Sequence, residues 1–199
     1  MAVWLHRTWH FDFAFQKVRA VVALAAHRRE FCPIQRRLAG LRWDGIPRVE
    51  AWLHAYLGVP DTAYARKAGA CWLVSAVARI FDPGCQVDYV LVLEGPQRTG
   101  KSTAIQELAM SLDFYTDQIR DVGAAECEKL LEGKWIVELG ELAATARTEL
   151  EKIKAFITSR TSRYRPSYGR SVRDYPRRCI FIPTMKRRAA CRRTSTTTL

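Results

Sequence analysis

The chain has 199 residues, of which 48% are apolar, so it can bury one core with at most a small helical subdomain attached. No apolar run approaches the length that crosses a bilayer, and the first residues lack the order of a signal peptide, which argues against a membrane protein and predicts a cytoplasmic location. The net charge of +12 indicates a polyanionic partner, and the six widely spaced cysteines disfavour a zinc site or a disulfide framework.

The first part of the chain is predicted to be helical. Apolar positions recur at helical intervals between residues 15 and 39, where Pro33 divides the pattern into two helices. Pro47 suits the first turn of a helix that runs to about Leu57, and Gly58 is well placed to end it.

A longer helix should follow, capped by Asp61 and covering Tyr64 to Phe81. Its apolar residues are expected on one broad face that contains Cys71, Trp72, Val74, Val77 and Ile80.

A glycine-rich loop is the most informative motif of the chain. An apolar run from residue 87 predicts a buried strand, the pattern G-x-x-x-x-G-K-S follows it, and residues 103–110 predict a helix. Gly95 and Gly100 let successive N–H groups point at phosphate oxygens, Lys101 reaches the β- and γ-phosphates, and the Ser102 hydroxyl ligates Mg²⁺. We therefore predict a site for ATP and Mg²⁺ made by Gly95, Pro96, Gln97, Arg98, Thr99, Gly100, Lys101, Ser102 and Thr103.

A helix near residues 124–131 should precede a second buried strand, Trp135 to Glu141, which ends in acids. An NTPase needs a carboxylate at a strand end, to hold Mg²⁺ and to polarise the attacking water. We assign Glu138, with Ser102, to the metal and Glu141 to the water. The predicted catalytic residues are thus Lys101, Glu138 and Glu141. The alternative is a strand that merely ends at a solvated acidic edge.

A basic segment follows a predicted helix at residues 149–158. From Ser159 onward the sequence has twelve Lys and Arg residues and one acid, Asp174, so nearly all of the net charge lies there. Arginines alternate with tyrosines, and guanidinium groups bind phosphates while aromatic rings stack on exposed bases. We predict a nucleic-acid surface, with DNA as the favoured partner, made by Lys154, Arg160, Arg163, Tyr164, Arg165, Tyr168 and Arg170. The alternative is a structural loop whose tyrosines anchor it to the core.

Six blocks of the sequence are more specific together than the loop alone. They are Leu41 to Arg48, Leu93 to Gln97, Trp135 to Glu141, Ile153 to Phe156, Tyr164 to Arg170 and Pro176 to Ile182. In this order they resemble the virulence-associated protein E (VapE) family of phage and genomic-island proteins. The resemblance extends from about Val18 to Ile182. The resemblance implies a superfamily 3 helicase-type AAA+ NTPase that binds ATP, acts in mobile-element DNA replication and assembles as a homo-oligomeric ring.

The sequence departs from this family after Ile182. Family members continue into a polar turn with an asparagine that senses the γ-phosphate, and they later supply an arginine that acts on a neighbouring subunit's nucleotide. Residues 183–199 contain no asparagine and form a basic, Thr-rich stretch. We interpret this stretch as a truncated or frame-shifted end, or as a disordered arm.

The predicted fold is α/β: a three-layer P-loop NTPase sheet with helices on both faces, preceded by an N-terminal helical layer. Its parts are a helical region at residues 1–86, an NTPase core at residues 87–183 that ends in a third strand at residues 179–182, and a tail at residues 184–199. The predicted function is that of a VapE-like ATPase acting on nucleic acid. The alternatives are a non-catalytic, basic nucleic-acid-binding fragment of such a motor, and a small-molecule kinase, for which the sequence shows no acceptor site.

Overall fold

The computed structural model describes residues 7–8, 15–28, 31–122, 124, 126–140, 147–166 and 171–186. The chain divides into two compact units, residues 1–41 and residues 42–199. The first unit contains helices α2 (Phe15–Arg28) and α3 (Pro33–Ala39), and Pro33 lies in the first turn of α3, where a missing N–H costs no hydrogen bond. Pro33 therefore separates two helices, as the sequence predicts.

The second unit contains a four-stranded parallel sheet. Its strands are β1 (Leu93–Gly95), β2 (Tyr115–Thr116), β3 (Ile136–Gly140) and β6 (Ile180–Lys186), in the order β1-β6-β3-β2. In the register, Leu93 pairs with Thr184, and Glu138 pairs with Ile182. The carboxyl ends of all four strands thus meet at one edge, and ligands bind at this edge in open α/β sheets.

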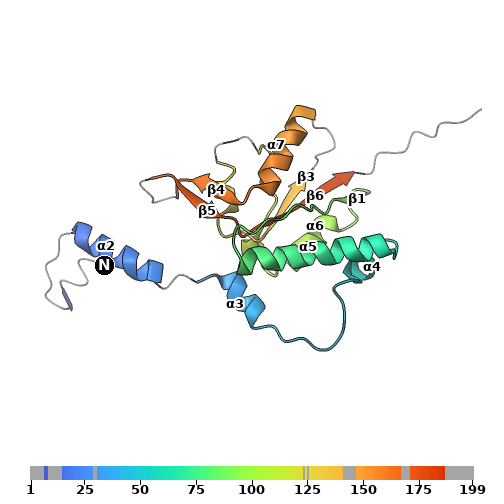
Figure 1. The fold of residues 1–199 in the computed structure, drawn as a ribbon, viewed down its shortest axis with the longest axis horizontal. Coiled ribbons are helices and arrows are strands. Elements are labelled where there is room, and N and C mark those ends of the chain that lie inside the picture. The colour runs from blue at the N-terminus through green and yellow to red at the C-terminus, as the bar shows by residue number, and fades with distance from the viewer. Residues whose placement is uncertain are drawn as a thin grey trace, which may run out of the picture. The chain divides into compact units, whose positions relative to one another are not determined.

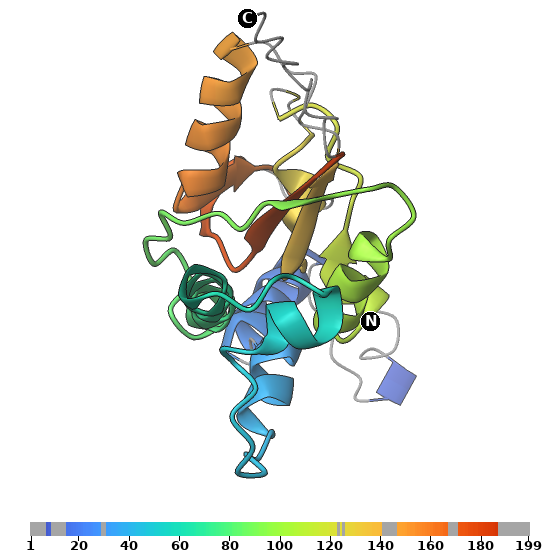
Figure 2. The same cartoon turned by 90° about the vertical axis from the view of Figure 1, so that its right-hand side faces the viewer.

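Helices cover both faces of this sheet. Helix α6 (Lys101–Leu108) leads from β1 to β2, whereas α7 (Arg147–Thr158) lies between β3 and β6 and crosses the sheet in the opposite direction. Right-handed crossovers place two such helices on opposite faces. Figure 1 and Figure 2 show α7 on one side, and α6 and α5 (Ala63–Phe81) on the other. The prediction of an α/β fold with helices on both faces is confirmed.

Indole hydrogen bonds hold α5 against the sheet. Trp72 of α5 is 1% exposed and donates its indole N–H to the carbonyl of Phe181 in β6, at 3.1 Å. In return, Trp135, next to β3, donates its indole N–H to the carbonyl of Ala76 in α5, at 2.8 Å. A short helix, α4 (Trp52–Leu57), contacts both α5 and α6. These three helices form the layer on one face of the sheet.

The other face is an apolar core beneath α7. Val137 and Leu139 of β3 point to this face, because alternate residues of a strand share a face. Phe181 of β6 meets Phe156 of α7, with ring centroids 5.3 Å apart. The rest of this core consists of Ile119, Cys127, Leu131, Ile153, Ile157 and Cys179. Glu138 lies between Val137 and Leu139 in sequence, so its side chain points to the opposite face, where α6 lies.

An antiparallel hairpin that the sequence did not predict lies between α7 and β6. Its strands are β4 (Thr161–Tyr164) and β5 (Arg173–Pro176). Arg163 pairs with Asp174 in the register and places Nε 3.8 Å from its carboxylate. Tyr164 packs against Tyr175, with ring centroids 4.6 Å apart. Part of the arginine and tyrosine pattern thus belongs to a β-strand, in which successive side chains point to opposite faces.

The predicted cap and apolar face of α5 are partly wrong. The N-cap is Thr62, whose hydroxyl accepts the N–H of Ala65 at 3.1 Å. Asp61 instead accepts two hydrogen bonds of 2.6 Å from Arg66, which lower the pKa of this carboxyl. The residues of α5 that are buried are Gly69, Trp72, Ala76, Arg79 and Ile80, whereas Cys71, Val74 and Val77 are exposed. The helix contacts the sheet through a narrow stripe, so the broad apolar face was an overestimate.

Four further boundaries differ from the predictions. Helix α4 begins at Trp52 rather than near Pro47, and β1 starts only at Leu93, with residues 87–92 outside the sheet. The third strand continues as β6 to Lys186, into the region assigned to the tail. Where a helix was predicted at residues 124–131, the described residues of this range contain a 3₁₀ turn, η2 (Lys129–Leu131), and no α-helix. Another such turn, η1 (Leu112–Phe114), precedes β2. Among the described helices, none is both long and apolar enough to cross a membrane.

Candidate functional site

The loop between β1 and α6 turns through two residues with positive φ. Arg98 has a φ of 60° and Gly100 a φ of 78°, and α6 begins directly after Gly100. Among the residues that the structure describes, no atom lies within 4 Å of the place that a Cβ of residue 100 would occupy, so the left-handed backbone, rather than crowding, requires glycine there. The first N–H groups of α6 have no partner inside the helix, and the positive end of its dipole lies at this loop.

The Lys101 ammonium lies over the base of the loop. It donates hydrogen bonds to the carbonyls of Gly95 at 3.0 Å and Pro96 at 2.6 Å, and it lies 3.3 Å from the hydroxyl of Thr99. Thr99 in turn donates to the Pro96 carbonyl at 3.0 Å. The positive charge is therefore held by neutral oxygens of the loop, which an anionic ligand could replace.

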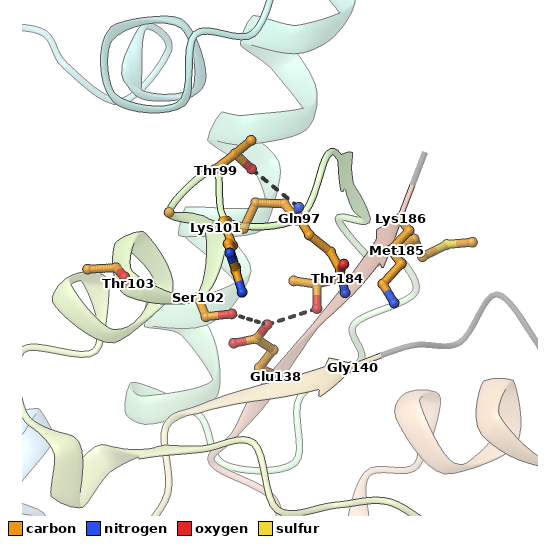
Figure 3. A pocket seen from close by; sticks show the side chains of 12 residues that line it. Gln97, Thr99, Lys101, Ser102, Thr103, Glu138, Gly140, Thr184, Met185 and Lys186 are labelled. Carbon is orange, nitrogen blue, oxygen red and sulfur yellow. Dashed lines mark hydrogen bonds between the residues drawn. The ribbon is translucent and has the colours of Figure 1, made fainter. Parts of the chain in front are cut away.

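Glu138 is a buried carboxylate that gathers hydroxyl groups from other parts of the fold. It is 4% exposed, and its Oε1 accepts hydrogen bonds from Ser102 of α6 and Thr184 of β6, both at 2.8 Å. Its Oε2 accepts a hydrogen bond of 2.5 Å from the hydroxyl of Tyr115 in β2. Figure 3 shows the Ser102 and Thr184 hydroxyls directed at the carboxylate. Three donors thus compensate the cost of burying this side chain.

Tyr115 itself is held in its protonated form. Burial is the main reason that the pKa of its phenol rises, and the hydrogen bond to Glu138 raises it further. The phenol therefore remains a donor to Glu138 at neutral pH.

A cavity of about 380 Å³ lies between the loop and the carboxyl ends of β3 and β6. The loop and the first turn of α6 line one side, the ends of β3 and β6 line the other, and Glu138 lies at its wall (Figure 3). Its lining residues are Gln97, Arg98, Thr99, Gly100, Lys101, Ser102, Thr103, Glu138, Gly140, Thr184, Met185 and Lys186.

A second, larger cavity of about 1050 Å³ also adjoins the loop. It lies between the α4 and α5 helices and residues 88–96, and its lining is mostly apolar. Thr99 and Lys101 line both cavities. A ligand with an anionic part and a flat apolar part could therefore occupy both.

The structure brings most of the predicted nucleotide-site residues together. Residues 97–103 and Glu138 line the smaller cavity, while Gly95 and Pro96 line the larger one and accept from Lys101. Glu141 lies outside the described residues, so its assignment to the water stays a prediction. Sequence reasoning missed Tyr115, Thr184 and Lys186, because only the pairing of strands distant in sequence brings them to the site.

The predicted nucleic-acid residues fall into two groups. Arg160 and Tyr164 make contacts within the protein: Arg160 donates to the Gly84 carbonyl at 2.8 Å, and burial raises the pKa of Tyr164 to about 12. Lys154 and Arg163 are exposed and form surface ion pairs, with Glu151 and Asp174 respectively. Arg165 is also exposed. Tyr168 and Arg170 lie outside the described residues, so the nucleic-acid surface stays a prediction.

Arg177 belongs to the basic segment in sequence but is 3% exposed. It donates to the Ser162 hydroxyl at 2.8 Å, to the Phe156 carbonyl and to Glu128 at 3.3 Å, and its guanidinium lies over the Phe156 ring, 4.5 Å from the centroid. This arginine thus joins the hairpin, α7 and Glu128, and it has no free face for a phosphate. The sequence around Arg177 contains no pattern that distinguishes it from the exposed arginines of the same segment.

The described residues contain no cluster of three or more His, Cys, Asp or Glu side chains that could hold a metal ion by themselves. A divalent ion at Glu138 would therefore need oxygens from a ligand or from water in addition to those of the protein.

Comparison with known proteins identifies a family. The sequence model described as the virulence-associated protein E-like domain matches residues 38–192, which extends ten residues beyond Ile182. No match is found among curated proteins.

The similar solved structures include two of the NrS-1 C-terminal region, both without ligand. One has 20% sequence identity and a TM-score of 0.46, and covers 63% of this chain and 30% of that chain. The other has 18% identity and a TM-score of 0.42, with coverage of 63% and 29%. This chain therefore spans less than a third of the length of those chains.

Proposed function

This chain belongs to the virulence-associated protein E-like domain family, and we propose that it binds ATP with Mg²⁺ at the loop of residues 95–103 and hydrolyses it. The observation that carries the proposal is the 2.8 Å hydrogen bond between Ser102 and Glu138, which joins the start of the loop helix to a buried strand carboxylate at the wall of the smaller cavity. A glycine-rich loop, a helix start and such a carboxylate at one sheet edge are the parts of a P-loop NTPase. The finer assignment to the superfamily 3 helicase-type AAA+ class is also a proposal, and its support is the family resemblance of the sequence.

Phosphate binding would use the loop backbone and Lys101. Gly100 turns the chain so that α6 starts at the cavity, and its unpaired N–H groups and positive dipole end favour a phosphate there. The ammonium of Lys101 would exchange the carbonyls of Gly95 and Pro96 for charged phosphate oxygens. Because hydrogen bonds to charged acceptors are about twice as strong as those to neutral ones, this exchange favours the bound state.

The residues present fit Mg²⁺. This ion prefers oxygen ligands in octahedral geometry at about 2.1 Å, so that neighbouring ligands lie about 3 Å apart. Ser102 Oγ and Glu138 Oε1 are 2.8 Å apart in the structure, with one hydroxyl and one carboxylate oxygen as donors. When bound, the ion would neutralise charge on the phosphates. Thr184 and Tyr115 would keep the Glu138 carboxylate oriented.

The larger cavity offers a place for the nucleobase. It is lined by apolar side chains of α4 and α5, including Leu53, Leu57 and Trp72, and it shares Thr99 and Lys101 with the phosphate cavity. A base there would remain connected to phosphates at the loop.

We propose that the nucleotide site serves an action on nucleic acid in the replication of a phage or another mobile element. The support is the family, together with the exposed basic side chains Lys154, Arg163 and Arg165 on α7 and the hairpin. An assembly of several copies, as in ring-shaped motors, belongs to the same proposal.

Calorimetric titration with Mg-ATP tests the nucleotide site, and release of inorganic phosphate tests hydrolysis. We expect saturable binding that Lys101→Ala weakens at least tenfold, because it removes the ammonium from both cavities. Glu138→Gln should reduce the dependence of binding on Mg²⁺. Lys152→Ala removes an exposed lysine of α7 that lines neither cavity, and it should change nothing. Folded protein that shows no saturable heat, or binding that is insensitive to Lys101→Ala, would contradict the proposal.

A further inference from the structure

The loop that leads into α4 presents a tryptophan to solvent. Trp43 is 79% exposed, and Ile46 and Val49 of the same loop are half exposed. We infer that this segment, residues 42–49 and hereafter the Trp43 loop, docks head to tail on the outer face of α5 in a second copy of this chain. The inference rests on the assembly that the proposed function includes, and it names the two surfaces that would form the contact.

Hydrogen bonds within the Trp43 loop fix the position of the indole. Trp43 donates its ring N–H to the carbonyl of Ile46 at 3.2 Å. The carboxylate of Asp44 accepts from the N–H of Ile46 at 3.1 Å and from Arg48 at 2.8 Å. Because the only polar atom of the indole is satisfied inside the loop, the ring offers apolar surface alone. A side chain that is already held in place also loses little entropy when a partner covers it.

The outer face of α5 carries an apolar stripe that none of the described residues covers. Val74, Val77 and Phe81 follow one another at intervals of three and four residues, so they share one side of the helix. They are 62%, 39% and 48% exposed, whereas Trp72 and Ala76, on the side that packs inward, are 1% exposed. Contiguous exposed apolar side chains of this kind mark a surface for protein association.

The charges beside the two surfaces have opposite signs. Arg42 precedes Trp43, and Asp82 follows Phe81 at the end of α5, and both charged residues are exposed. When Trp43 packs on Phe81 of a second copy, Arg42 lies next to Asp82 of that copy. The acid of the loop, Asp44, is already held in an ion pair within the loop, so it does not oppose this contact. The two surfaces are therefore complementary in charge as well as in apolar character.

A second copy fits these observations because one chain carries both halves of the contact. The Trp43 loop and the stripe of α5 are exposed at the same time in one copy, so neither covers the other. A contact between two different surfaces repeats from copy to copy, and it closes into a ring when the rotation allows. Tryptophan and arginine are enriched at the centres of protein interfaces. A nucleic acid is a poorer fit, since the aliphatic side chains of Ile46 and Val49 accompany the indole.

Sedimentation velocity over a range of concentrations, with and without Mg-ATP, tests the contact. Wild-type protein should self-associate, and Trp43→Ala and Val74→Glu should each weaken association at least about tenfold, because each removes apolar contact from the interface. An equimolar mixture of the two variants should form dimers where each variant alone is monomeric, since one retains the stripe and the other retains the loop. Leu112→Ala removes an exposed apolar side chain of η1, outside both surfaces, and should change nothing.

Exchange of the charges tests which residues meet. Arg42→Glu and Asp82→Lys should each weaken association, and the double variant Arg42→Glu/Asp82→Lys should regain most of it, because opposite charges then face each other again. Both positions are exposed, so the variants should fold, and thermal unfolding curves check this. A double variant that associates no better than the single variants would contradict the pairing of Arg42 with Asp82.

The outcomes are distinguishable from failure of the nucleotide site. Trp43 and Val74 line neither of the two described cavities, so Trp43→Ala should bind Mg-ATP as the wild-type protein does. Wild-type protein that binds ATP but stays monomeric, or a mixture of variants that forms no dimer, would refute the inference and leave the nucleotide site intact. Association without ATP binding would refute the nucleotide site alone. If Trp43→Ala weakens binding to a labelled oligonucleotide but leaves self-association unchanged, the loop serves nucleic acid and the inference is wrong.

Discussion

The hydroxyl of Tyr115 lies 2.5 Å from Oε2 of Glu138, whose other oxygen accepts from Ser102 and Thr184. Tyr115 comes from β2, at one edge of the sheet, and Glu138 from the neighbouring strand β3. One oxygen of the carboxylate is thus held from within the sheet, while the other faces the residues of the cavity. The phenol fixes the direction of the acid on which the proposed metal site depends.

Tyr115→Phe should separate this orientation from the packing of the ring. Phenylalanine keeps the buried ring but removes the hydroxyl. Among the described residues, this hydroxyl is the only hydrogen-bond donor to Oε2 of Glu138. We expect a loss of about 1 to 3 kcal/mol in the free energy of unfolding, because a buried charged acceptor loses a hydrogen bond. We also expect weaker Mg²⁺-dependent ATP binding. Urea unfolding and calorimetry measure the two effects.

Tyr56→Phe is the matched control, because Tyr56 is 69% exposed. It should leave both quantities unchanged within about 0.5 kcal/mol. Equal effects of the two substitutions would show that Tyr115 does not support Glu138.

The local parts of the candidate site were predictable from sequence. Residues 95–103 and Glu138 each follow from a short pattern: a glycine spacing between a strand and a helix, and an acid within an apolar run. Such patterns depend on residues that are neighbours in the chain. The α/β fold with helices on both faces followed from the same strands and helices.

The convergence on Glu138 was not predictable, because it depends on which strands become neighbours. Tyr115, Glu138 and Thr184 are brought together only by the order β1-β6-β3-β2, in which the last strand inserts next to the first. Thr184 also required β6 to extend beyond residue 182, where the sequence changes to basic residues. The hairpin was missed for a related reason: its composition suggested a binding loop and obscured the alternation of a strand.

Arg177→Met should destabilise the fold by about 3 kcal/mol. The guanidinium is buried and bonded to Ser162, Phe156 and Glu128, so its removal leaves these acceptors without their donor. Glu128 remains partly exposed, at 28% for its side chain, and its access to water limits the loss. Urea unfolding measures the effect. Arg178→Met changes an exposed neighbour and should cost less than 1 kcal/mol, and similar losses for both variants would refute a structural role specific to Arg177.

Stability should fall as the pH rises above 9. Burial raises the pKa of the Cys179 thiol to about 11, so the unfolded chain loses this proton at a lower pH than the folded protein does. The folded state binds more protons between these values, and a rise in pH therefore favours unfolding. The loss from this thiol is fully developed above pH 11 and amounts to about 2 to 3 kcal/mol.

Urea unfolding between pH 7 and pH 10.5, under reducing conditions, measures this dependence. Cys179→Ala should flatten it, although the buried Cys127, whose pKa is also raised to about 11, should keep part of the slope. Cys71→Ala removes an exposed thiol and should leave the slope unchanged. An unchanged slope in Cys179→Ala would contradict the assignment.

Single-stranded DNA should bind through the exposed arginines of the hairpin. Arg163 and Arg165 lie on and just after β4. Arg163 forms an ion pair with the exposed carboxylate of Asp174 at 3.8 Å, an interaction that costs little to exchange for a phosphate. We expect the double variant Arg163→Ala/Arg165→Ala to weaken DNA binding. It should also make the slope of log affinity against log salt concentration shallower by about 1 to 2, because fewer phosphate contacts mean that fewer counterions are released on binding. Fluorescence anisotropy with a labelled oligonucleotide at several salt concentrations measures both quantities.

Arg36→Ala/Arg37→Ala removes the same charge from the last turn of α3 and should leave the slope unchanged. Equal slopes for the wild-type protein and the hairpin variant would place the DNA contacts elsewhere on the chain.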